Sequence, residues 1–582
     1  MMKNKQNKTN NHIDWLSVII CAAPILFFML INMFCFDTYY DLNDDVTIKD
    51  MLSGIFTGVP DPHVVYMKYP LTIILALMYR VLPNVSWLGL FELVCLAFSC
   101  FVISYSIVKL TKKRYLQIFL SLAMSFVFQA LLIYQSIFVQ YTVVSGVLAV
   151  AGMVSIFFSK DYEEGSGNGN IITGIVLFAL SFCIRDSMFL FVSPFILASV
   201  LIKFFLQKGE KKESIKRAIP FIISFVIVMI AIVGIDKLAY SSKAWREYKE
   251  FNDYRTTLFD YQKDAPWYMF HPEIYDEMGF SESEAQVLVD TNLMFTDRID
   301  TSILKRVVAY NKVTLGKGYF AVGFKDALTF YLYTLHKTRE CKYCYLIIGM
   351  YLFLMIVSIV RKRYVYIPIV LSIFVIKSID WMYLIMRGRI KDRVTVPLCF
   401  CEIMLLLCLI IKLGYEEKRA FVLIAIVCLA LTMFYPTFRR NLKDTNEEMA
   451  LRIEKDKGWA EFRDYCDSRY ENFYFMDLIS NITFSEKIFA NDDVKYSNYT
   501  LCGGWLSKSP SYERKLSVRS ITDVDEAILN RDDIYFISMD FRDTNWLSGY
   551  YNDRGYYVSC DEVDRIYIND SQYYVVYGVN IR

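Results

Sequence analysis

Histidine and charged residues are scarce in this chain. Only 4 of its 582 residues are histidine, and charged residues make up 21%. So few histidines argue against a histidine-based metal or acid–base centre. The sequence contains no GxSxG, HExxH or P-loop pattern, which excludes the common hydrolase, zinc-protease and nucleotide-binding signatures. Its net charge of +2 provides no basic excess for a phosphate backbone, so we expect no nucleic-acid partner.

Apolar residues, by contrast, are abundant and gathered into long runs. Hydrophobic residues make up 55% of the chain and aromatic residues 16%. Runs of roughly 20 apolar residues are long enough to cross a bilayer as helices. Most of the 14 cysteines lie inside these runs, where they behave as small hydrophobic residues. The sequence therefore predicts an α-helical polytopic membrane protein without a disulfide framework.

The charges of the short loops orient these spans, because cytoplasmic loops carry an excess of Lys and Arg. The basic N-terminus is predicted to be cytoplasmic, followed by a retained span at 14–36. The apolar piece 71–82 is only about 12 residues, too short to cross, and is predicted to lie along the membrane. About eleven spans result, at 14–36, 87–108, 115–134, 138–158, 171–184, 188–206, 218–235, 346–360, 364–379, 394–411 and 420–435.

Two parts of the chain follow from this topology. Residues 1–437 form a transmembrane domain with outer loops at 37–86 and 236–345, and residues 438–582 form an extracytoplasmic α/β domain. The α/β prediction rests on a polar helix at 445–469 and a second helix at 523–529, separated by short alternating or apolar runs. Three aromatic side chains of this region either stack on sugar rings or belong to its core: Trp505, Trp546 and Tyr550.

An acidic pair, Asp44-Asp45, begins the first outer loop just after the first span. A carboxylate pair at a membrane surface could act as a general base. It could also bind a divalent cation such as Mg²⁺ or Mn²⁺, although no cofactor is required by the sequence. The alternative interpretation is structural: the acids cap a helix predicted at 47–56.

Basic residues on the outer side are the one exception to the predicted charge bias. Arg387, Arg389 and Arg393 follow the span at 364–379. Such a cluster suggests an anionic ligand near the lipid headgroups, such as a phosphate, although ordinary lipid phosphate is the simpler partner. Arg185 lies between two apolar runs and is either a phosphate ligand or a snorkelling anchor.

In these features the chain resembles the GT-C superfamily of integral-membrane glycosyltransferases. The resemblance rests on Asp44-Asp45 after the first span, on the stretch Met67 to Tyr79 as a juxtamembrane helix, and on the eleven-span layout with an outer C-terminal domain. It covers residues 14–437, and the tail matches no family. The chain has Lys68-Tyr69-Pro70 where a His-Pro-Pro is typical of the family.

The resemblance implies transfer of a sugar from a polyprenyl-phosphate carrier in the lipid bilayer to an extracytoplasmic cell-envelope glycan or lipid acceptor, in a bacterial cell membrane. Asp44 or Asp45 would be the catalytic base. The donor phosphate would be held by Arg387, Arg389 and Arg393, with Lys68 and Arg185 as further candidates.

Two other classes remain open on the sequence. A lipid-linked glycan flippase or transporter should carry charges buried in the middle of its spans, whereas Glu92, Lys377 and Glu402 are expected near span ends. An envelope-assembly protein of the O-antigen ligase or polymerase type would share the outer arginines but would have less use for the acidic pair.

Overall fold

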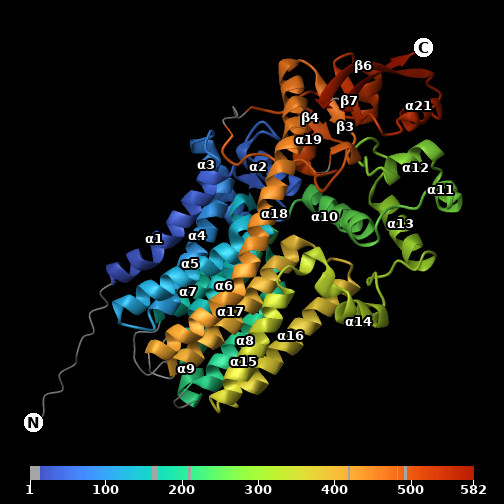
Figure 1. The fold of residues 1–582 in the computed structure, drawn as a ribbon. Coiled ribbons are helices and arrows are strands. Elements are labelled where there is room, and N and C mark those ends of the chain that lie inside the picture. The colour runs from blue at the N-terminus through green and yellow to red at the C-terminus, as the bar shows by residue number, and fades with distance from the viewer. Residues whose placement is uncertain are drawn as a thin grey trace, which may run out of the picture.

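The computed structural model describes residues 14–159, 168–207, 211–416, 420–481, 483–490, 495–569 and 571–582. A bundle of long helices forms one end of the molecule, and a smaller domain containing a β-sheet forms the other (Figure 1). The helix α18 (Ala420–Ser468) runs from the bundle into the sheet domain. The predicted fold class, a helical membrane protein with a C-terminal α/β domain, is confirmed.

Eight helices of the described chain are long and apolar enough to cross a membrane. Three shorter apolar helices occupy the other predicted spans: α6 (Tyr141–Phe157), α7 (Asn168–Ile184) and α15 (Cys344–Val360). The eight are α1 (Trp15–Cys35), α4 (Trp87–Val108), α5 (Arg114–Ile137), α8 (Asp186–Leu206), α9 (Lys211–Ala239), α16 (Tyr366–Met386), α17 (Asp392–Glu416) and α18.

The apolar piece predicted to lie along the membrane forms α3 (Tyr69–Val81), a helix of 13 residues. A helix of that length spans roughly 20 Å, short of the hydrocarbon core of a bilayer. Pro70 stands in its first turn, where its missing N–H has no helical acceptor to lose.

The boundary predicted between residues 437 and 438 falls inside α18, a continuous helix of 49 residues. The separate helix predicted at 445–469 is therefore wrong. Thr445 does not cap a helix start, because its hydroxyl donates to the carbonyl of Asn441, one turn earlier, at 2.7 Å. The polar part of α18 continues the apolar part without a break, so the two regions of the chain share one helix.

The C-terminal sheet has the order β4-β3-β5-β7-β6. Its first three strands, β4, β3 and β5, are parallel, and β7 pairs antiparallel with both β5 and β6. Helices α19 (Pro510–Ser517), α20 (Val524–Asn530) and α21 (Asn545–Asn552) complete the domain. The strands are β3 (Phe473–Met476), β4 (Tyr499–Leu501), β5 (Ile534–Met539), β6 (Val558–Asn569) and β7 (Gln572–Ile581).

The segment 236–345, predicted to be an outer loop, folds mostly as helices beside the sheet domain (Figure 1). Ser281 and Glu284 form a capping box at the start of one of these helices, and Asp300 caps the start of another. Phe295 from this segment packs against Trp546 and Tyr550, with ring centroids 5.0 and 4.9 Å away. Both aromatics therefore belong to a core joining the two parts. The segment's remaining helices are α10 (Lys243–Arg255), α11 (Pro272–Met278), α12 (Glu282–Val289), α13 (Thr301–Val313) and α14 (Phe324–Tyr333).

Candidate active site between the helix bundle and the C-terminal domain

The acidic segment is held in place by short strand pairings on both sides. Strand β1 (Tyr39–Tyr40) pairs in parallel with β2 (Phe138–Val139), which joins α5 to α6. The N–H of Tyr40 also donates to the carbonyl of Glu486 at 2.9 Å, so a loop of the C-terminal domain covers the other edge. The residues that follow β1 thus lie between the helix bundle and that domain.

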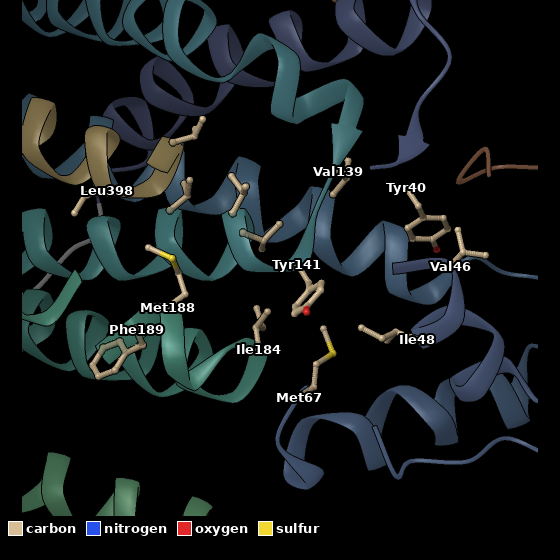
Figure 2. Packing of buried hydrophobic residues seen from close by; sticks show 14 of the residues in the cluster. Tyr40, Val46, Ile48, Met67, Val139, Tyr141, Ile184, Met188, Phe189 and Leu398 are labelled. Carbon is tan, nitrogen blue, oxygen red and sulfur yellow. The ribbon is translucent and has the colours of Figure 1, made fainter. Parts of the chain in front are cut away.

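Helix α2 (Asn43–Ser53) carries the acidic pair and is fixed by buried apolar side chains on more than one side. Val46 and Ile48 are fully buried, as is Tyr141 at the start of α6. Figure 2 shows these side chains in one packed layer with Met67. Asp44, on the same helix, is only partly buried.

Asp45 has no solvent exposure, and both of its carboxylate oxygens accept backbone hydrogen bonds. One accepts from the N–H of Tyr141 at 3.0 Å and the other from the N–H of Leu42 at 3.2 Å. Burial raises the pKa of Asp45 well above its usual range, and the charges of Asp41 and Asp44 raise it further. The helix start predicted at residue 47 is wrong, because α2 begins at Asn43 and contains both acids. Asp45, its third residue, contributes to the cap by accepting from the N–H of Leu42, the residue before the helix.

Asp44 is the accessible member of the pair. Its Oδ2 lies 3.1 Å from Nη1 of Arg393, the second residue of α17, and both side chains are partly exposed. The carboxylate of Asp44 also lines an open cleft between α2 and the C-terminal domain. Geometry thus gives Asp44 both a guanidinium partner and access to a ligand.

Arg185, between α7 and α8, is the second cation of this site. Its guanidinium lies 4.7 Å from the ring centroid of Tyr66 and 5.6 Å from that of Tyr141. It makes no ion pair and no side-chain hydrogen bond within the described part of the chain. Burial raises the pKa of Tyr66 well above its usual range; the charge of Asp44 raises it further and that of Arg185 opposes the shift. Asp44 and Arg185 therefore both act on the same phenol.

The other three predicted phosphate ligands are engaged elsewhere. Lys68 Nζ lies 2.7 Å from Asp186 and 3.6 Å from Asp236. The Arg387 guanidinium lies over the rings of Tyr261 and Tyr319 and donates to the carbonyl of Tyr319. Arg389 pairs with Asp260 at 3.6 Å. The structure thus brings two of the five predicted cations, Arg393 and Arg185, to the acidic site.

Arg452 is a site residue that the sequence analysis missed. From α18 it pairs with Asp41 at 2.6 Å and with Glu448 at 2.8 Å, and it donates to the carbonyl of Tyr40. It therefore clamps the start of the acidic segment to the long helix. No local signal marks it, because a partner 411 residues away is set by the tertiary structure alone.

Both carboxylates of the acidic pair already have partners in this structure. Asp45 uses both oxygens on backbone amides, and Asp44 is paired with a cation. In the residues that the structure covers there is no group of three or more His, Cys, Asp or Glu side chains arranged to hold a metal ion.

Comparisons with known proteins give a structural match only. No protein-family model matches the sequence, and no curated protein sequence does. The crystal structure of ArnT from Cupriavidus metallidurans bound to undecaprenyl phosphate has a TM-score of 0.41 and 10% sequence identity, over 97% of this chain and 98% of that one. The same protein in the apo state gives a TM-score of 0.40 at 10% identity, over 97% of each chain.

Proposed function

We propose that this chain is a membrane glycosyltransferase of the GT-C type, which moves a sugar from a polyprenyl-phosphate carrier to an extracytoplasmic cell-envelope glycan or lipid acceptor. One observation carries the proposal. The accessible carboxylate of Asp44 lies 3.1 Å from the guanidinium of Arg393, in a site that also contains the Arg185 guanidinium. A base beside two cations at the ends of membrane helices is what transfer from a lipid-linked phosphate requires.

The chemistry assigns a role to each group. The Asp44 carboxylate accepts the proton of an acceptor hydroxyl as its oxygen bonds to the anomeric carbon of the donor sugar. The bond from that carbon to the phosphate oxygen breaks, and its electron pair leaves with the polyprenyl phosphate. Guanidinium groups stabilise the negative charge that develops on the phosphate, since charge-assisted bonds from arginine to phosphate are strong and geometrically matched.

The two arginines differ in how many of their N–H groups are available to bind a phosphate. The guanidinium of Arg185 rests on aromatic rings, so its N–H groups remain available to a phosphate. Arg393 must divide its donors between Asp44 and a phosphate. Binding of the donor would weaken its hold on Asp44, leaving the carboxylate freer to accept a proton. Arg387, Arg389 and Lys68 remain secondary candidates for the donor headgroup.

The position suits a lipid carrier. Arg185 joins α7 to α8 and Arg393 begins α17, so both cations stand at the ends of apolar helices. A polyprenyl tail in the bilayer would place its phosphate at this depth. By the charge bias of the loops, this end is extracytoplasmic and the N-terminus cytoplasmic.

The test uses purified full-length protein in lipid nanodiscs with a panel of radiolabelled polyprenyl-phosphate sugars. Release of polyprenyl phosphate is measured for the wild type, for Asp44→Asn and for the exposed control Asp532→Asn. We expect wild-type turnover, an unchanged control, and a loss of about 10²- to 10⁴-fold in Asp44→Asn, the usual contribution of a general base. If no donor is consumed, or if Asp44→Asn retains full activity, the proposal is wrong.

A flippase or transporter is the second candidate, and one observation favours it. Lys377 and Glu402 were expected near span ends, but they are buried near the middles of α16 and α17, 3.7 Å apart. Tyr351 donates to the same Glu402 carboxylate at 2.7 Å. Charges buried in a membrane are costly and often functional. Flipping of a fluorescent lipid-linked sugar in proteoliposomes, lost in Lys377→Met but retained in Asp44→Asn, would favour this candidate.

A further inference from the structure

A cleft between α2 and β4 adjoins the proposed catalytic base. Its volume is about 90 Å³, and it is open to solvent. One wall is the polar side of α2, with Asn43, Asp44 and Thr47, and the opposite wall is β4 with the loop that follows it, up to Leu506. We call it the α2–β4 cleft. Because Asp44 lies in its wall, a molecule bound there can present a hydroxyl to that carboxylate.

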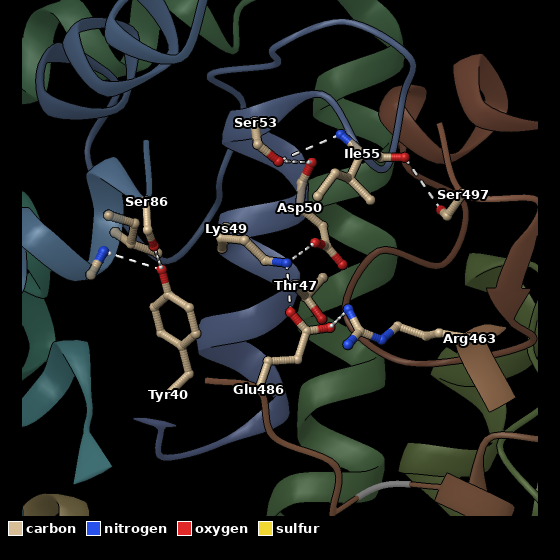
Figure 3. Close-up of polar contacts among 12 residues, drawn as sticks. Tyr40, Thr47, Lys49, Asp50, Ser53, Ile55, Ser86, Arg463, Glu486 and Ser497 are labelled. Carbon is tan, nitrogen blue, oxygen red and sulfur yellow. Dashed lines mark hydrogen bonds and ion pairs between the residues drawn. The ribbon is translucent and has the colours of Figure 1, made fainter. Parts of the chain in front are cut away.

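The charges that line the α2–β4 cleft all have one sign. Two carboxylates, Asp44 and Asp50, contribute to its wall, and none of the described lining residues is Lys, Arg or His. Lys49, on the adjoining face of α2, does not supply a free cation, because it bridges Asp50 at 2.7 Å and Glu486 at 2.6 Å. Figure 3 shows both contacts. The cations of the site, Arg393 and Arg185, also lie outside the lining.

The remaining lining is aromatic and hydroxyl-bearing. Trp459, Tyr499 and Trp505 contribute rings, while Ser497 and Thr500 contribute hydroxyl groups. The Thr500 hydroxyl is buried and interacts with Tyr512, another lining residue. Flat apolar rings interspersed with hydroxyls and carboxylates match the surface of a sugar, which has apolar C–H faces and hydroxyl edges.

The wall opposite α2 depends on two glycines. A side chain at Gly503 would collide with the backbone carbonyl of Thr291, since its Cβ would lie 2.1 Å from that oxygen. Gly504 has φ +96°, a conformation that other residues rarely adopt. This turn places Trp505 in the wall of the cleft. The ring of Trp505 also packs on that of Tyr66, with the ring centroids 4.9 Å apart. Tyr66 in turn supports the Arg185 guanidinium, so the wall of the cleft and the cationic site are in contact.

We infer that the α2–β4 cleft is the acceptor site, and that the acceptor unit it holds is an uncharged sugar or an amino sugar rather than a phosphorylated or carboxylated one. The inference rests on the proposed function, in which the bound molecule is the acceptor substrate, and adds the chemical class of that substrate. An anionic acceptor unit would find no cation among the lining residues and would lie beside the carboxylates of Asp44 and Asp50, so the cleft disfavours it. An ammonium group would be attracted by the same carboxylates. Donor phosphate and acceptor are thereby sorted by charge to opposite sides of Asp44.

The test measures binding without requiring catalysis. Full-length protein in lipid nanodiscs is titrated with methyl glucoside, methyl glucosaminide and methyl glucoside 6-phosphate. Saturation-transfer difference NMR measures the affinity for each sugar. We expect the first two to bind and the phosphate to bind at least about tenfold more weakly. In Trp505→Ala, binding of all probes should fall about tenfold, while the exposed Trp267→Ala control is unchanged.

A second variant keeps the inference testable if Trp505→Ala misfolds. Thr47 is half-buried on the polar side of α2, and Thr47→Lys places a cation in the cleft without removing either carboxylate. It should bring the phosphate probe to within about threefold of methyl glucoside, because the added ammonium offsets the repulsion. A Thr47→Lys variant that rejects the phosphate as strongly as the wild type would count against the inference.

The outcomes separate the two proposals. If the wild type binds the phosphate as tightly as the neutral sugar, or binds none of the probes, the acceptor-class inference is overturned even where polyprenyl phosphate is released. If the neutral sugars bind as expected but no donor is consumed, the cleft stands as a sugar site and the transferase proposal fails.

Discussion

Asp44 and Arg393 are 349 residues apart in the chain, yet their side chains form an ion pair of 3.1 Å at the end of the helix bundle. The pair joins the first long polar segment to the start of α17. It therefore places the proposed base and a proposed phosphate ligand in the same site. Substitution of either Asp44 or Arg393 therefore tests the role of this ion pair in turnover.

Arg393→Met should lower kcat/KM for the lipid-linked donor by about 10- to 100-fold, which corresponds to the loss of one charge-assisted hydrogen bond. Arg393→Lys should recover part of the loss, because an ammonium keeps the charge but not the planar fork. Steady-state release of polyprenyl phosphate is the measurement. Equal activity in the Met and Lys variants would contradict a role for the charge.

Arg185→Met should raise the KM for the donor without unfolding the protein, since the guanidinium makes no polar contact in the described chain that its removal would break. We expect an effect of about tenfold or more. The control is Arg565→Met, an exposed arginine of β6. A drop in the melting temperature with an unchanged KM would show instead that Arg185 is a structural anchor.

Asp45→Ala should destabilise the protein by about 1–3 kcal/mol for each backbone amide left unpaired. The amides are those of Leu42 and Tyr141. Asp45→Asn should fall between the wild type and the Ala variant, because one oxygen is retained. Thermal unfolding in nanodiscs measures the effect. Loss of turnover in Asp45→Asn at an unchanged melting temperature would make Asp45 the base after all.

Arg452→Met should be strongly destabilising, on the order of 3–5 kcal/mol, because it leaves the carboxylates of Asp41 and Glu448 without their cation. Burial already raises the pKa of Asp41, with Arg452 opposing the shift. Adding Asp41→Asn to Arg452→Met should therefore restore part of the stability. A double variant that is less stable than Arg452→Met alone would show that the pair does not act as a unit.

Lys515 provides a prediction of pH dependence. It is fully buried in α19, and its Nζ contacts the Ser497 hydroxyl at 2.8 Å and the Ser497 and Phe56 carbonyls. Burial lowers its pKa to about 7, with Asp50 opposing the shift and Arg519 adding to it. The unfolded chain therefore binds more protons than the folded one between pH 7 and 10.5, the ordinary pKa of lysine.

The free energy of unfolding contributed by this lysine should thus rise with pH from about 7 upward, by at most about 1.4 kcal/mol per pH unit. The difference in stability between the wild type and Lys515→Met, measured by thermal unfolding at pH 6.5, 8 and 9.5, should shift in favour of the wild type as the pH increases. A difference that is constant with pH would mean that Lys515 keeps an ordinary pKa.

Local features of the chain were predictable because they depend on neighbouring residues. The first span, the short helix around 71–82 and the caps at Ser281 and Asp300 follow from hydrophobic length and from hydrogen bonds within one turn. Strand β4 was missed because three residues are too few to show a pattern. The break predicted in α18 was wrong because a polar stretch after an apolar one can continue the same helix.

The sequence by itself determined the class of the protein, its long apolar helices and the residue types available for chemistry, since these depend on composition and periodicity along the chain. Only the tertiary structure decided that Asp45 is buried as a cap while Asp44 faces the cleft. It also decided which arginines join that carboxylate: Arg393 and Arg185 do, and Arg387 and Arg389 contact Tyr261 instead. Such choices depend on packing between helices hundreds of residues apart, which no local pattern encodes.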